Sequence, residues 1–93
     1  MAKIYIEDSR GMADFTIYEE SSRGMADLSI FVESSRGMAN GDERWYYENS
    51  RGMADSKIYF EKSRGMADLK VFFEDSRGMA KWHKSHKLRG RIG

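Results

Sequence analysis

Asp-Leu-Ser-Ile-Phe-Val-Glu-Ser-Ser-Arg-Gly-Met-Ala, residues 27–39, is one copy of a unit that recurs along the whole chain. The serine that opens Ser-Arg-Gly-Met-Ala stands at positions 9, 22, 35, 50, 63 and 76, so the spacing is 13 residues except for one step of 15. The long step contains an inserted Asn40-Gly41. A fixed period of this kind often determines the architecture of a small protein. For these 93 residues it predicts one six-repeat domain at 1–80, with halves 1–39 and 42–80, followed by a basic segment at 81–93.

The first part of each unit has the composition of a β-strand. Position four is Ile, Val or Trp, position five is always aromatic, and position six is apolar in five of the six copies. Such side chains suit a pleated, half-buried surface, whereas a glycine in every unit disfavours a helix. We therefore expect an all-β or strand-dominated fold, with six short strands in two pseudo-symmetric halves.

Alternation along a strand places positions two, four and six on one face, which we expect to be the core face. In the third unit this face reads Leu28, Ile30 and Val32. Glu19, and Glu43 and Ser56 near strand starts, interrupt the same face in other units. Their strands are therefore expected to lie at a sheet edge or to have their ends in water.

The connector Ser-Arg-Gly-Met-Ala is too long for the tightest hairpin, so a simple meander is not required. Glycine permits a positive φ in a turn, which predicts a structural role for the repeat glycines. These are Gly11, Gly24, Gly37, Gly52, Gly65 and Gly78. The flexible, apolar methionines of the connectors are expected to fold over the ends of the core. These are Met12, Met25, Met38, Met53, Met66 and Met79.

The composition excludes some kinds of chemistry. Without cysteine the chain has no disulfide, no thiolate nucleophile and no thiolate metal ligand. No apolar run reaches the roughly 18 residues of a membrane-spanning helix, and the first residues lack the apolar region of a signal peptide. The expectation is a monomeric cytoplasmic protein without a cofactor.

The repeats resemble a known family. The units at 27–32 and 68–73, with Trp45-Tyr46-Tyr47 after the central Asn40-Gly41, are similar to the septknot family over roughly residues 2–84. This is a bacterial domain of unknown function named for a seven-crossing torus knot. The resemblance implies a knotted chain, although proteins almost never form knots. The near-identical connectors also fit an engineered or idealised member of that family.

Two recurring patterns could carry chemistry. Each unit has a glutamate three residues before an arginine, as in Glu33 and Arg36, and such carboxylates could act as acid and base. Charge pairing across or along the strands is the favoured interpretation, because a catalytic set should be distinctive and this one is the same in every unit. The aromatic fifth position could stack on sugars or bases, but cross-strand aromatic packing is favoured.

The C-terminal segment departs from the repeat. Residues 1–80 carry a net charge of −4, whereas residues 81–93 carry +5. The five cations are candidates for binding nucleic acid or an acidic protein. They are Lys81, Lys84, Lys87, Arg89 and Arg91. The alternative is a solvated tail partly ordered against the acidic body.

The same segment contains one tryptophan and two histidines. Trp82 occupies the second column of the repeat, which suggests the start of an aborted seventh unit. His83 and His86 are three residues apart, but two ligands do not make a metal site. The sequence thus predicts a non-catalytic structural or interaction domain, with binding of anionic partners through the tail as the alternative function.

Overall fold

The computed structural model describes residues 2–93, and Met1 of the predicted repeat domain lies outside this range. Each repeat contributes one strand and one turn of 3₁₀ helix, and a short seventh strand follows the sixth turn. The strands are β1 Ala2–Ile6, β2 Phe15–Glu19, β3 Leu28–Val32, β4 Arg44–Tyr47, β5 Ser56–Phe60, β6 Leu69–Phe73 and β7 Lys81–Trp82. The turns are η1 Arg10–Met12, η2 Arg23–Met25, η3 Arg36–Met38, η4 Arg51–Met53, η5 Arg64–Met66 and η6 Arg77–Met79. The strand-dominated fold is therefore confirmed.

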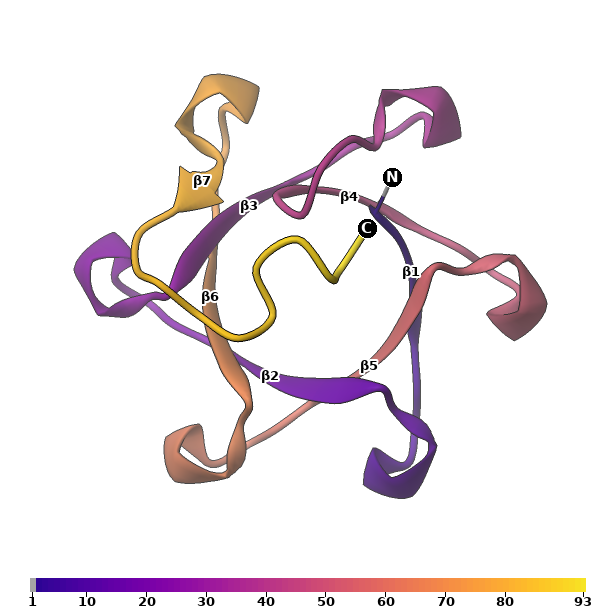
Figure 1. The fold of residues 1–93 in the computed structure, drawn as a ribbon, viewed down its shortest axis with the longest axis horizontal. Helices are drawn as coiled ribbons and strands as arrows, with labels where there is room; N and C mark the ends of the chain where they lie inside the picture. The colour runs from indigo at the N-terminus through magenta and orange to yellow at the C-terminus, as the bar shows by residue number, and fades with distance from the viewer. Residues whose placement is uncertain (1) are drawn as a thin grey trace.

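Strands β1 to β6 form a closed barrel in which all neighbours are parallel. The order around the barrel is β4-β1-β5-β2-β6-β3, and β3 pairs with β4 to close it. Figure 1 looks down the barrel axis, which is the shortest dimension of the molecule, 21 Å against 31 and 32 Å. Position four of each strand lies opposite position two of the next, as Ile4 lies opposite Ser56 and Ile17 opposite Leu69. This constant stagger tilts the strands and allows the sheet to close.

Every parallel pairing joins one strand of the first half to one strand of the second half. The chain passes over one barrel position between successive strands, so β1, β2 and β3 alternate with β4, β5 and β6. Because the barrel has an even number of strands, steps of two positions would return the fourth strand to the place of the first. The single step between adjacent positions, from β3 to β4, contains Asn40 and Gly41. The insertion therefore lies at the point where the chain leaves the set β1, β2 and β3 and begins the set β4, β5 and β6.

The interior of the barrel is filled by positions two and four. Ile4, Ile17, Ile30, Trp45 and Ile58 are completely buried. The side chains at position six are less buried and lie around the carboxyl end of the barrel, where Glu19 is exposed. The prediction of edge strands is wrong, because each of the six repeat strands has a partner on both sides. The alternative that strand ends reach water is right for Glu19, but Ser56 is buried.

The connectors project from the corners of the barrel, as Figure 1 shows. Their methionines are 40 to 56% exposed, so the expectation that they cover the core is wrong. The expectation that the repeat glycines adopt positive φ is also wrong. Positive φ occurs at Gly41 and Gly90 and not at the repeat glycines. Each repeat glycine lies inside a 3₁₀ turn, where a Cβ atom would contact nothing closer than about 3.9 Å.

Candidate functional site

The six repeat glutamates are buried, and each pairs with an arginine of a neighbouring repeat. In the first unit, Glu7 accepts hydrogen bonds from both Nε and Nη2 of Arg51, at 2.7 and 2.9 Å. The partners are far apart in sequence for most pairs, 51 residues for Arg10 and Glu61. The six pairs are Arg10–Glu61, Arg23–Glu74, Arg36–Glu48, Arg51–Glu7, Arg64–Glu20 and Arg77–Glu33. They follow the strand order around the barrel, so the predicted pairing across strands is confirmed and forms a closed circle.

The aromatic fifth position supports these arginines. The guanidinium carbon of Arg51 lies 5.5 Å from the centre of the Tyr5 ring, and Arg10 lies 5.8 Å from Tyr59. The same contact occurs between Arg23 and Phe72, Arg36 and Tyr46, and Arg77 and Phe31. A cation over an aromatic face is attracted by the ring quadrupole. The expected cross-strand aromatic contacts occur instead at positions four and six, for example Phe60 with Phe73. These five rings of the fifth column are occupied by side chains of the protein itself.

The arginines lower the pKa values of four of these carboxylates, Glu7, Glu33, Glu61 and Glu74. Glu33 accepts hydrogen bonds from Arg77 and also from Arg44. These hydrogen bonds lower the pKa of Glu33 to about 2, although burial of the carboxylate acts in the opposite direction. The pKa of Glu7 is lowered by its hydrogen bonds from Arg51, and that of Glu61 by those from Arg10. A carboxylate held ionised in this way is a poor proton donor near neutral pH.

The fold brings a serine, a histidine and a carboxylate together, Ser29, His83 and Glu74, which the sequence did not predict. Oγ of Ser29 lies 2.7 Å from Nε2 of His83. The pKa of Glu74 is lowered chiefly by its hydrogen bonds from Arg23, and Ser29 also contributes to lowering it. Ser29 is completely buried, so a substrate cannot reach its hydroxyl in this conformation. The repeat spacing gave no signal for it, because His83 lies in the non-repeating tail and meets β3 only through the fold.

The tail closes the amino end of the barrel. In Figure 1 it runs from β7 across the middle of the ring. Ile92 is 1% exposed and belongs to the core, and its carbonyl oxygen accepts a hydrogen bond from Oγ of Ser56 at 2.6 Å. The buried carboxylate of Asp42 accepts from Nε1 of Trp82 and from the backbone N–H groups of Gly90, Ile92 and Gly93. Asp42 is thus the centre of the contacts that hold the tail.

Asp42 differs from the other aspartates at the first position of a repeat. Asp14, Asp27, Asp55 and Asp68 each accept the backbone N–H of a residue on the neighbouring strand, as Asp27 accepts that of Lys70 at 3.0 Å. Asp42 follows the insertion, where Gly41 has a φ of +66°. Positive φ is accessible to glycine without steric cost. The turn at Gly41 therefore accompanies the redirection of one repeat aspartate toward the tail.

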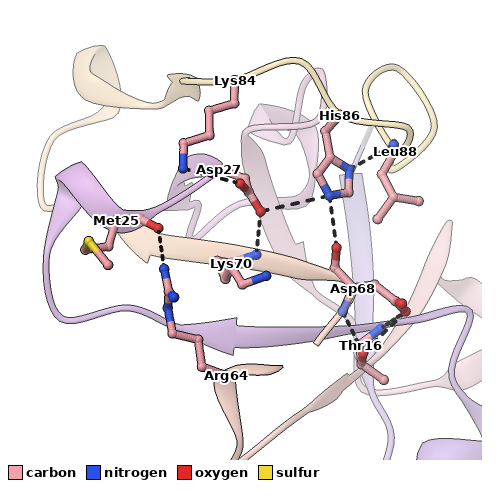
Figure 2. Close-up of polar contacts among 9 residues, drawn as sticks. All are labelled: Thr16, Met25, Asp27, Arg64, Asp68, Lys70, Lys84, His86 and Leu88. Atoms are coloured by element: carbon pink, nitrogen blue, oxygen red, sulfur yellow. Dashed lines mark hydrogen bonds and ion pairs between the residues drawn. The ribbon is translucent and has the colours of Figure 1, made fainter. Parts of the chain in front are cut away.

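The first part of the tail lies along the rim of the same end. Nε2 of His86 lies 2.9 Å from the carbonyl oxygen of Asp68, and its Nδ1 accepts the backbone N–H of Leu88 at 3.1 Å (Figure 2). Nζ of Lys84 and Nε2 of His86 each lie 3.9 Å from a carboxylate oxygen of Asp27. His83 and His86 both use Nε2 for contacts within the protein.

The five candidate cations of the tail remain on the surface. Lys81, Lys84, Lys87, Arg89 and Arg91 are all exposed, although the backbone of this segment donates hydrogen bonds to Asp27 and Asp42. Trp82 packs against the core, as expected for a residue in the second column. However, β7 runs antiparallel to β3, so it does not continue the parallel pattern as a seventh unit would.

The fold and the circle of six arginine–glutamate pairs define a class of protein. It is a closed barrel of six parallel strands built from short tandem repeats, in which strands of the first half pair with strands of the second half. The chain belongs to the Septknot family, described as a 7(1) septoil knot domain, which matches residues 1–83. The recognition made from the sequence is therefore confirmed. Neither curated proteins nor solved structures gave a match. Within residues 2–93, no helix has the length and apolar character needed to cross a membrane.

Proposed function

We propose that this chain is a non-catalytic scaffold or interaction domain whose backbone is knotted. The circle of six arginine–glutamate pairs supports this proposal, because the side chains best suited to acid–base chemistry are each held in a structural contact. The path of the chain is compatible with the knot of its family, since the strands of both halves follow one another around the same barrel. A scaffold also explains why the six repeats are equivalent.

Pulling the two ends of single molecules apart in optical tweezers tests the knot. A knotted chain should unfold to a contour length shorter than that of 93 extended residues, because the tightened knot retains part of the chain. A linear control with the same composition should reach its full length. Full extension of the native chain would contradict the knot.

Screening the intact protein against ester, phosphoester, peptide and glycoside substrates tests the absence of catalysis. The expected result is no turnover above that of a heat-denatured sample. Turnover that is abolished by Ser29→Ala would contradict the non-catalytic proposal and would identify the buried serine as reactive.

A second candidate function is binding of an anionic partner through the tail. It is favoured by one observation: five cations are exposed on a segment whose backbone is fixed to the barrel. Such a charge cluster attracts nucleic acid in a strongly salt-dependent manner. Removing residues 81–93 would be a poor test, because Ile92 belongs to the core.

The sharper test neutralises the five cations to glutamine and leaves the contacts of Asp42 and Ile92 in place. A matched control neutralises Lys3, Lys57 and Lys70 on the barrel wall. Binding to single- and double-stranded nucleic acid should weaken only in the tail variant. Equal binding of both variants, or no binding by the native chain at low salt, would exclude this function.

A further inference from the structure

The contacts of the last residues resemble those of a bound peptide more than those of a strand in a sheet. Backbone N–H groups of Gly90, Ile92 and Gly93 donate to one carboxylate, and the carbonyl of Ile92 accepts from Ser56. These backbone groups are present in any peptide, and here a turn at residues 87–90, where Gly90 has a φ of +81°, brings them to the barrel. Recognition of this kind depends on main-chain hydrogen bonds and on a pocket for one side chain.

A single side chain of this segment enters the core. Ile92 is buried, whereas Lys87, Arg89 and Arg91 are exposed and Leu88 is half-buried. The barrel supplies the two polar partners from different strand starts: Asp42 precedes β4, and Ser56 begins β5. Both are nearly buried, at 7 and 4% exposure. The end of the barrel therefore presents a small apolar site with a buried acceptor and a buried donor.

The strands and charge pairs of the barrel lie outside this segment. All six strands and the six charge pairs lie within residues 2–82, and the family match ends at residue 83. Residues 84–93 thus lie beyond the domain that defines the family, yet they occupy a site built from residues inside it. The rim near this site also carries carboxylates, including Asp27 beside Lys84, which complement a cationic segment.

We infer that the amino end of the barrel is a peptide-binding site, centred on Asp42 and Ser56, which this chain fills with its own segment 84–93. The ligand class is a cationic peptide that adopts the same turn and has one aliphatic side chain in the position of Ile92. The bound segment is a ligand in cis, which leaves and returns while the barrel stays folded. A peptide of the same sequence competes with it in trans.

The test uses a full-length Ile92→Gly variant, which weakens the hold on the native segment, and a fluorescent peptide corresponding to residues 84–93. Fluorescence anisotropy should show saturable binding to this variant. Binding to the native chain should be weaker by about tenfold or more, because its site is already occupied. Two matched controls should not bind: the peptide with Ile92→Asp on the variant, and the native peptide on the Asp42→Asn, Ile92→Gly double variant.

These measurements are made in about 0.15 M salt, so that contacts between exposed charges are partly screened. If the Ile92→Asp peptide bound as well as the native one, the association would be electrostatic and the proposed site would be wrong. Absence of saturable binding to a folded Ile92→Gly variant would also overturn it.

Hydrogen exchange of the native chain provides a second measurement that does not depend on any variant. The amides of Gly90, Ile92 and Gly93 should exchange through local opening, at least tenfold faster than amides of β1 and β5 after correction for intrinsic rates. Exchange at the same rate as the barrel would show that the segment opens only with the fold, and the proposal would fail.

Discussion

With the exception of Arg64, each repeat arginine combines two contacts that lysine could not make together. Its planar guanidinium donates two parallel hydrogen bonds to a carboxylate, as Arg51 does to Glu7, and the same plane lies near an aromatic ring. A lysine ammonium has the charge but not the fork geometry. Exposed ion pairs usually contribute little, but here the carboxylate partner is buried, so loss of its arginine would leave a buried charge unpaired.

Acid should destabilise the protein through these carboxylates. The pKa of Glu33 is lowered to about 2 and those of Glu7, Glu61 and Glu74 are lowered from the ordinary 4.5. The native state then binds fewer protons than the unfolded state in this range, so stability is present above the unfolded pKa and is lost as pH falls through the folded one. Urea unfolding from pH 7 down to about 2 should show this decline.

Glu33→Gln should flatten this acid dependence and lower stability at neutral pH, because Glu33 pairs with two arginines. Asp75→Asn, which changes an exposed carboxylate, is the matched control and should leave the pH profile nearly unchanged. An unaltered profile in Glu33→Gln would contradict the assignment.

Tyr47 should make the protein sensitive to alkali. Burial and, secondarily, the charge of Glu19 raise its pKa to about 12. The folded state therefore retains a proton that the unfolded state loses near pH 10, so this stability is present below pH 10 and lost as pH rises toward 12. Ultraviolet titration should show a late-titrating tyrosine signal that is absent in Tyr47→Phe. Complete titration of all five tyrosines near pH 10 would contradict this prediction.

At the scale of elements, the six connectors have the same construction. Each begins at an extended serine, makes one 3₁₀ turn closed by hydrogen bonds such as Met12 N–H to the Ser9 carbonyl, and ends at an extended alanine. Arginine is the first residue of the turn, which directs its side chain back to the barrel wall. The connector is therefore the element that positions the charge pairs, while its glycine and methionine face solvent.

Replacing a repeat glycine by alanine should stabilise the protein. Gly52, Gly65 and Gly78 have φ values that other residues adopt, and a Cβ there would meet open space. Alanine reduces the entropy of the unfolded chain, worth about 0.4–1 kcal/mol at each position. Denaturant unfolding of single and combined variants measures the gain.

The matched control is Gly41→Ala, where φ is +66° and the new Cβ would lie 2.6 Å from Oε1 of Glu43. This variant should lose about 1–2 kcal/mol. Destabilisation by alanine at the repeat positions would show that the turns need glycine after all.

The repeat was sufficient to predict the elements but not their arrangement. The alternation of Leu28, Ile30 and Val32 predicted a strand and its core face. Nothing local distinguishes a barrel from a layered sheet, because strand partners are 43 to 52 residues apart for most pairs, as Asp14 and Lys57 are. The methionines were misplaced for a related reason: apolar character alone does not tell whether a connector folds inward or projects.

The candidate site was also only partly predictable. Charge pairing followed from the equivalence of the repeats, but the partner of each arginine depends on the order of the barrel. The tail looked like a charged surface segment, because its cations are frequent and its one deeply buried anchor, Ile92, is a single residue. The insertion at Asn40 and Gly41 was visible in the sequence, and its effect on Asp42 required the structure.

For the whole molecule, the alternation of the two halves around the barrel makes each half depend on the other. Strands β1, β2 and β3 pair with β4, β5 and β6, and the six charge pairs cross between the halves in the same way. Contacts of such large sequence separation make folding slow, because loop closure must precede pairing.

Separate chains of residues 1–40 and 41–93 should therefore be unfolded, with no β-sheet signal in circular dichroism. Mixing them at high concentration should restore the sheet if the knot is not needed for its stability. Stable structure in either fragment alone would contradict the alternation.

The alternation has a consequence for synthesis on the ribosome. A nascent chain leaves the ribosome from its first residue onward, and most domains begin to acquire structure as soon as a supersecondary unit has emerged. Here the first three strands emerge without any neighbour to pair with, since their partners have not yet been translated. These strands therefore remain without their partners until β4, β5 and β6 have emerged. Their hydrophobic side chains are exposed to chaperones for that time, and the barrel can close only after β6 has left the ribosome.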